Sequence, residues 1–170
     1  MRAWIGLGGN FDESQRLLDS ALAMLDETEG IRVLRRSRIY RSPPWGVTNQ
    51  ADFVNAVAEM ETSLTPEGLL SELLATEKRL GRERDGQRWG PRCIDLDLLT
   101  CGDRVLETET LQLPHPRMHL RAFVLKPILE LEPGFRIPGF GSARRALEML
   151  DSQEAGAVCP IGPKKQEPTR

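Results

Sequence analysis

The sequence predicts an α+β fold in which helices cover one face of an antiparallel sheet. Apolar residues recur at alternating positions in four short segments and at helical spacing in two longer ones. These segments follow one another as strand, helix, strand, strand, helix and strand, which is the ferredoxin-like βαββαβ arrangement. At 170 residues, the chain is long enough for one such domain with a proper core.

The first strand and helix are predicted in residues 3–25. Residues 3–7 form a short apolar run that Gly8 and Gly9 end, as is typical of a buried strand. Asp12 is placed to cap the helix that follows. The apolar stripe of that helix consists of Leu17, Leu18, Ala21, Leu22, Met24 and Leu25.

The next two strands are predicted in residues 31–41 and 53–60. The first of them alternates around a basic patch and is predicted as one strand. Pro43 and Pro44 end it, because proline lacks the backbone donor that a sheet requires. The second carries a nearly continuous set of apolar side chains, which favours a buried position in the sheet.

A second helix and a fourth strand complete the predicted sheet. Thr65 precedes Pro66, and a capping residue followed by proline is a signal for the start of a helix. Leucines continue the helix to Gly81. Charged residues dominate positions 82–92, which are predicted as a loop, and residues 93–100 as the last strand.

The remainder of the chain is predicted as a C-terminal extension of the same domain. Helices are expected around residues 121–129 and 143–150, so a single domain spans residues 1–150. Beyond it, Gly, Pro, Lys and Gln dominate, and we expect residues 151–170 to form a mobile tail.

Two aspartates lie inside the last predicted strand, in the stretch RWGPRCIDLDLL. A strand places Ile94, Leu96 and Leu98 on one face, and Asp95 and Asp97 on the other. Neighbouring carboxylates repel each other unless a positive charge lies close to them. A solvated polar face is the ordinary explanation of such alternation, but arginines gather just before it: Arg82, Arg84, Arg88 and Arg92. We therefore expect a site that holds both a metal cation and an anion.

Composition excludes several classes of protein. The formal net charge of −2 argues against wholesale binding of nucleic acid. No apolar run approaches the length of a membrane span, and the first apolar segment is too short for a signal peptide. The three cysteines form no CxxC pair, so we expect reduced thiols in a cytoplasmic protein, and no zinc site.

Five motifs occur in a fixed order: GLGGN, YRSPPWG, DFVNAV, RWGPRCIDLDLL and LPHPRMHLRAFVLKP. In their order and spacing they resemble the 6-hydroxymethyl-7,8-dihydropterin pyrophosphokinases of folate biosynthesis, over about residues 1–140. That family transfers the terminal pyrophosphate of ATP to the hydroxymethyl oxygen of the pterin and releases AMP. The resemblance implies the same magnesium-dependent transferase reaction here, with ATP and reduced hydroxymethylpterin as substrates, in a protein that we expect to be a monomer.

The resemblance also assigns residues to the reaction centre and to ATP. It implies that Asp95 and Asp97 hold two Mg²⁺ ions, and that Arg82 and Arg92 are catalytic. Carboxylates and phosphate oxygens suit Mg²⁺, and arginine provides planar donors for phosphate. The residues implied in ATP binding are Glu77, Arg82, Arg84, Trp89, Arg92, Leu98, His115 and Arg121. We assign His115 to phosphate rather than to a metal pair with His119, because prolines flank it.

For the pterin, the resemblance implies a ring stacked between Phe53 and Phe123 and read by Asn55. Phe53 and Asn55 are two residues apart, so on a strand both side chains face the same way. Ordinary core packing is the alternative for the two aromatic residues. The residues implied in pterin binding are Ser42, Pro43, Pro44, Trp45, Phe53, Asn55, Trp89 and Phe123. We expect the loops 42–50 and 82–92 to close over bound substrates.

Three rival interpretations make different demands on the sequence. An RNA-recognition domain of similar topology would show aromatic residues on adjacent central strands and a basic balance, and the sequence has neither. A Mg²⁺-dependent phosphohydrolase or nuclease would need a further acid near Asp95 and Asp97, and none is evident in sequence. A catalytically inactive scaffold should have lost some of the site residues, but Arg92 and Asn55 are present with both aspartates.

Overall fold

A six-stranded antiparallel sheet forms the centre of the protein. The computed structural model describes residues 1–9, 14–44, 52–81 and 94–162. The sheet consists of β1 (Arg2–Gly9), β2 (Ile31–Arg36), β3 (Ile39–Ser42), β4 (Phe53–Thr62), β5 (Asp95–Cys101) and β10 (Cys159–Ile161). The strands lie in the order β10-β3-β4-β1-β5, and β2 also pairs with β4. The predicted α+β class with an antiparallel sheet is therefore confirmed.

The segment predicted as one strand, 31–41, is two strands that both pair with β4. The interruption lies at the buried Ser37, whose hydroxyl accepts a hydrogen bond from the backbone N–H of Val57 at 3.0 Å. The Ser37 N–H in turn donates to the Val57 carbonyl at 2.9 Å. A side chain thus replaces one backbone partner, and β3 can leave the direction of β2 without losing its place beside β4.

Two helices cover one face of the sheet, as predicted. These are α1 (Ser14–Asp26) and α2 (Pro66–Arg79), and between them and the sheet lies the larger apolar core. The predicted start of α2 is confirmed, because the Thr65 hydroxyl accepts from the backbone N–H of Gly68 at 3.1 Å. This bond satisfies one of the free donors at the helix start.

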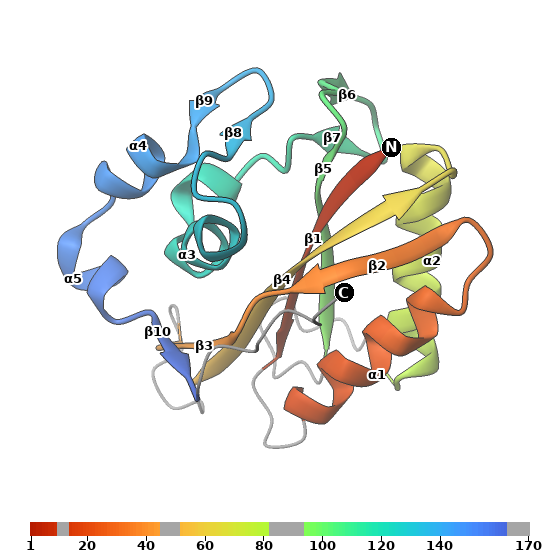
Figure 1. Cartoon of the computed structure of the whole chain (residues 1–170), viewed down its shortest axis with the longest axis horizontal. Helices are drawn as coiled ribbons and strands as arrows, with labels where there is room; N and C mark the ends of the chain where they lie inside the picture. The colour runs from red at the N-terminus through yellow and green to blue at the C-terminus, as the bar shows by residue number, and fades with distance from the viewer. Residues whose placement is uncertain (10–13, 45–51, 82–93, 163–170) are drawn as a thin grey trace, which may run out of the picture.

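The opposite face is also covered, which corrects the expectation of helices on one face alone. There α3 (Ala122–Leu131) and α4 (Ala143–Glu148) pack on Trp4, Val57 and Leu99 of the central strands. Figure 1 shows the sheet between these two groups of helices. Without these helices, the apolar side chains of this face would be exposed to water. Exposure would lower the stability of the fold, because burial is worth about 25 cal/mol per Å² of apolar surface.

Short elements connect and extend these layers. They are β6 (Leu106–Glu107), β7 (Gln112–Leu113), the 3-10 helix η1 (Met118–Leu120), β8 (Arg136–Ile137), β9 (Gly141–Ser142) and α5 (Ser152–Gly156). The expected mobile tail differs from the structure over its first part, because α5 and β10 lie within residues 151–161 and β10 pairs with β3. The edge of β3 offers free backbone donors and acceptors, which β10 satisfies. Residues 163–170 lie outside the described part.

Candidate active site

A cavity of about 360 Å³ opens at one end of the sheet. It lies where β1 and β3 end and where β4 and β5 begin, and these four ends meet because neighbouring strands run antiparallel (Figure 1). Its lining residues come from these strands, from η1 and from the start of α3. They are Gly6, Leu7, Gly8, Gly9, Ser42, Pro43, Phe53, Asn55, Ala56, Asp95, Asp97, Arg117, Leu120, Arg121, Phe123 and Val124.

Glycines of the central strand form the floor of this cavity. Gly8 is opposite Asn55 on β4 and opposite Asp95 on β5, and Gly6 is opposite Asp97. Residues opposite one another in an antiparallel pair point to the same face. A Cβ added at Gly8 would lie 3.0 Å from the Asn55 Oδ1 atom, so glycine keeps the space beside this amide open.

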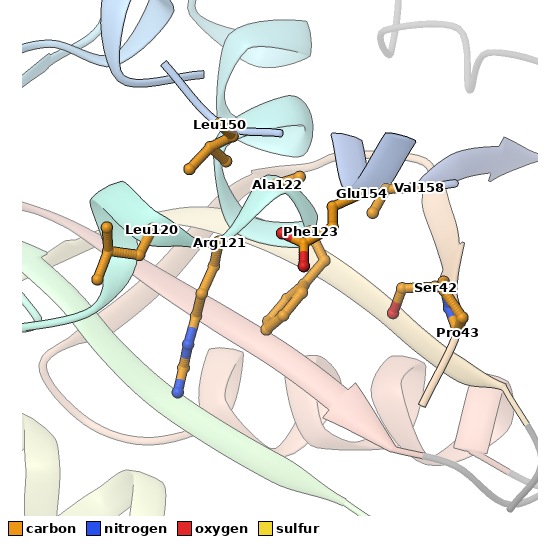
Figure 2. Close-up of a pocket in the computed structure, with 9 residues that line it drawn as sticks. All are labelled: Ser42, Pro43, Leu120, Arg121, Ala122, Phe123, Leu150, Glu154 and Val158. Carbon is orange, nitrogen blue, oxygen red and sulfur yellow. The ribbon is translucent and has the colours of Figure 1, made fainter. Parts of the chain in front are cut away.

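Two carboxylates line the β5 side of the cavity. Asp95 and Asp97 are half-buried, while Leu96 and Leu98 on the other face are 3% exposed. The predicted alternation of this strand is thus confirmed. An Arg121 Nη1 atom lies 3.5 Å from Asp97 Oδ2, so the cavity combines negative and positive groups. Figure 2 shows the Arg121 and Phe123 side chains extending from the start of α3.

An amide and two aromatic rings line the β3 and β4 side. Asn55 is buried, and its Nδ2 donates to the Ser42 hydroxyl at 2.9 Å. Phe53 and Phe123 both line the cavity, with the Arg121 guanidinium 5.5 Å from the centre of the Phe123 ring. A buried amide held in one orientation beside aromatic rings suits a flat heterocycle with both donors and acceptors.

His115 is outside the cavity lining, close enough to Asp95 for that charge to act on its pKa, and is held in a defined tautomer. Burial, and secondly the charge of Arg121, lower its pKa from 6.5 to about 4, while the charge of Asp95 acts in the opposite direction. Its Nδ1 accepts from the Arg117 backbone N–H at 3.1 Å, which leaves the proton of the neutral ring on Nε2. His115 can therefore donate one hydrogen bond to an anion at neutral pH.

Two other residues expected at ATP have their side chains away from the cavity lining. Glu77 is 3% exposed and accepts from the backbone N–H of Leu96 at 2.7 Å, which fixes β5 to α2. The Leu98 side chain belongs to the core beneath the sheet. Pro44 is half-buried and also outside the lining, whereas Pro43 is part of it.

Several expected site residues lie outside the described part of the chain: Trp45, Arg82, Arg84, Arg88, Trp89 and Arg92. The helix cap expected at Asp12, and most of the two loops expected to close, lie outside it as well. Within the described residues, no group of three or more His, Cys, Asp and Glu side chains gathers around a metal position. No described helix has the length and apolar character needed to cross a membrane.

Part of the cavity lining is not predicted by the sequence. Gly6 and Gly8 are two apart on a strand that also contributes apolar core residues, and this alternation could have indicated a floor open to a ligand. Arg117 and Leu120 come from η1, beside the start of α3. No local pattern predicts that this segment reaches the end of the sheet.

The fold and the cavity together define a small α+β protein in which an amide and two aromatic rings lie in one cavity with a pair of carboxylates. A family model described as 7,8-dihydro-6-hydroxymethylpterin-pyrophosphokinase (HPPK) matches residues 4–133. The chain therefore belongs to this pyrophosphokinase family.

Relatives similar in sequence agree with this assignment. The chain is 46% identical over 150 residues to the 2-amino-4-hydroxy-6-hydroxymethyldihydropteridine pyrophosphokinase of Methylorubrum extorquens, covering 88% of this chain and 94% of that protein. The enzyme of the same name from Pseudomonas aeruginosa is 39% identical, with 94% and 93% covered.

The structural neighbours are more distant in sequence. A Plasmodium falciparum wild-type HPPK-DHPS solved with pteroate has a TM-score of 0.66 at 12% identity, covering 85% of this chain. The present chain spans 41% of that longer chain. The same protein solved with pterin and p-hydroxybenzoate gives a TM-score of 0.65 at 13% identity, with 85% and 42% covered. These likenesses show the shared fold.

Proposed function

We propose that the cavity is the active site in which this protein transfers the terminal pyrophosphoryl group of ATP to 6-hydroxymethyl-7,8-dihydropterin, as a step of folate biosynthesis. The observation that carries the proposal is the arrangement across the glycine floor. Asn55 and the carboxylates lie on strands to either side of β1, two strand spacings or about 10 Å apart. That distance suits a bicyclic ring at one end and a phosphate chain at the other.

On the heterocycle side, Phe53 and Phe123 would stack on the pterin and Asn55 would bond its edge. The hydrogen bond from Asn55 to Ser42 restricts rotation of the amide, which lowers the entropy lost on binding. Pro43 and Ser42 contribute the neighbouring wall. Pro44, Trp45 and Trp89 remain proposed members of this subsite.

On the phosphate side, the residues present fit divalent cations. Asp95 and Asp97 are hard oxygen donors on one strand face, and Mg²⁺ commonly takes one or two carboxylates while keeping water and phosphate oxygens as its other ligands. We propose that these two aspartates hold two Mg²⁺ ions. When bound, such ions would neutralise charge on the phosphates and align the attacking and leaving oxygens.

Arg121 and His115 would orient the triphosphate. Arg121 extends into the cavity beside Asp97, and neutral His115 has a donor at Nε2. Arg82, Arg84 and Arg92 are proposed to add further contacts. In phosphoryl transfer, positioning and charge neutralisation supply most of the rate enhancement, so the site does not require a strong general base.

A hydrolytic enzyme is the second candidate that the paired carboxylates allow. Among the described lining residues, Asp95 and Asp97 are the only acids, and a third group to activate water is lacking there. The amide and aromatic side of the cavity would also have no purpose in simple hydrolysis. We therefore favour transfer, and we further propose that the protein acts as a monomer in the cytoplasm.

The products distinguish these functions. The full-length protein is incubated with ATP, Mg²⁺ and reduced hydroxymethylpterin, and the nucleotide and pterin products are separated by chromatography. We expect AMP and pterin diphosphate in equal amounts, with neither formed when the pterin or Mg²⁺ is omitted. ADP would indicate an ordinary kinase, and pterin-independent release of phosphate would indicate a hydrolase.

A further inference from the structure

Residues 150–161 lie beyond the stretch that matches the family model, yet they are attached to two walls of the cavity. We call them the C-terminal segment. On one side, β10 pairs with β3, with Cys159 opposite Arg41 and Ile161 opposite Ile39. On the other side, Lys126 of α3 donates from its Nζ to the Val158 carbonyl at 2.8 Å.

A second, smaller cavity of about 50 Å³ lies where this segment meets the larger one. Figure 2 shows its lining. Five lining residues are shared with the large cavity: Ser42, Pro43, Leu120, Arg121 and Phe123. Ala122 and three residues of the C-terminal segment complete it: Leu150, Glu154 and Val158. The C-terminal segment therefore lies directly behind the wall that faces the proposed pterin site.

Val158 is the apolar centre of this contact. It is 4% exposed and forms a small core with Tyr40 of β3 and Ala122 of α3, against which Phe123 packs. Because β3 ends at Ser42 and α3 begins beside Arg121, this core joins the two elements that carry opposite parts of the lining.

One polar link also joins β3 to α3. Glu130 accepts from the Tyr40 hydroxyl, and from the backbone N–H of Arg38 at 2.9 Å. Glu130 lies about two turns beyond Phe123 along α3, so this link holds the helix without fixing its first turn. Within that first turn, Ala122 is buried against Val158 and Phe123 packs on the same small core, while Val124 and Leu125 belong to the core on the central strands.

We propose that the C-terminal segment is a positioning element that sets the separation of the β3 and α3 walls and so determines the affinity for the pterin, with Val158 as the positioning residue. The proposal rests on the function argued above. Val158 lines only the smaller cavity, so it acts through Phe123 and Ser42 without touching the pterin. A misplacement of a wall by a fraction of an ångström weakens a closely fitted flat ligand.

The test compares substitutions of Val158 in the full-length protein. Val158→Ala is expected to weaken binding of reduced hydroxymethylpterin about three- to tenfold by calorimetry. Binding of a non-hydrolysable ATP analogue, and turnover at saturating pterin, should stay within about twofold. Val158→Ile keeps a branched apolar side chain at this position and should leave pterin affinity close to that of the unsubstituted protein. Val105→Ala makes the same change as Val158→Ala at a residue that is 63% exposed, and is the matched control.

Lys126→Met provides a second test, because it removes the bond to the Val158 carbonyl while leaving the apolar contact. It should also weaken pterin binding selectively, so the proposal stays testable if Val158→Ala folds poorly. A lower melting temperature with unchanged pterin affinity in both variants would overturn the inference, as would equal losses for both ligands. Failure of the unsubstituted protein to bind the pterin would overturn the proposed function, and this inference with it.

Discussion

At the cavity end, the two faces of the sheet are built from the same strands, but one face packs in the core and the other lines the cavity. Beneath the sheet, Leu7 of β1 and Leu96 of β5 are almost fully buried against α1 and α2. Above it, the same strands present Gly8 and Asp95 to an open cavity. Because side chains alternate along a strand, the sequence can place stability on one face and binding groups on the other with little conflict.

The largest expected effect is on stability, and it tests whether the lower face can be changed without changing ligand binding on the upper face. Leu96→Ala removes a buried side chain from the lower core and should reduce the free energy of unfolding by about 2–5 kcal/mol. Ligand affinities of the protein that remains folded should change little. Urea denaturation with parallel titrations of ATP and pterin measures both. A change in affinity larger than the change in stability would contradict the division.

The opposite result is expected from Asp97→Ala. This substitution should reduce AMP formation about 100-fold or more, because a charged group at the phosphates is lost. The unfolding free energy should stay within about 1 kcal/mol, since the Arg121 pair is partly solvated and repulsion between the aspartates is relieved. Asp97→Asn controls for side-chain volume. Near wild-type AMP formation at saturating Mg²⁺ would refute the proposed role of Asp97.

A further division, within the upper face, separates the amide side from the carboxylate side. Asn55→Ala should weaken pterin binding by about 1–3 kcal/mol, because polar atoms on the ligand edge lose their partner. Binding of an ATP analogue should be unchanged, since Asn55 lies across β1 from the aspartates. Separate titrations by calorimetry decide this point. Equal losses for both ligands would place Asn55 in the scaffold instead.

Much of the sheet and the lower core could be predicted because their signals are local. Alternation in β5 and the Thr65–Pro66 start of α2 each depend on a few adjacent residues. The interruption between β2 and β3 at Ser37 could not be predicted. It depends on the Ser37 hydroxyl, which accepts a hydrogen bond from the backbone N–H of Val57, 20 residues away on β4. The pairing of β10 with β3 likewise depends on an edge that exists only in the folded sheet.

The candidate site was likewise predictable only where the signal lies in a few adjacent residues. The side chains of Asp95, Asp97 and Asn55 face one cavity. Strand parity predicted that Asp95 and Asp97 share a face, as do Phe53 and Asn55, but only the resemblance to the family placed the two pairs in one site. The cover of the upper face by α3 and α4 was not predicted, because their apolar positions indicate burial without naming the surface they bury against. Contributions of Arg117 and Leu120 to the lining depend on that docking.

The smallest expected effect is the contribution of His115 to the pH dependence of the free energy of unfolding. Its pKa of about 4 lies below the ordinary 6.5, so above pH 6.5 the ring is neutral in both states and contributes nothing. As the pH falls from 6.5 to 4, the unfolded chain takes up a proton first, and the folded protein loses stability. Below pH 4 both states are protonated and the loss is constant. Allowing for partial exposure, we expect the free energy of unfolding to fall by about 1–2 kcal/mol over this range.

His115→Phe should remove this part of the pH dependence in denaturation experiments. His119→Gln is the control that measures the contribution of the other histidine. If His115→Phe and the unsubstituted protein lose stability in parallel between pH 6.5 and 4, His115 is not held neutral by burial, and its proposed role as a neutral donor to phosphate fails.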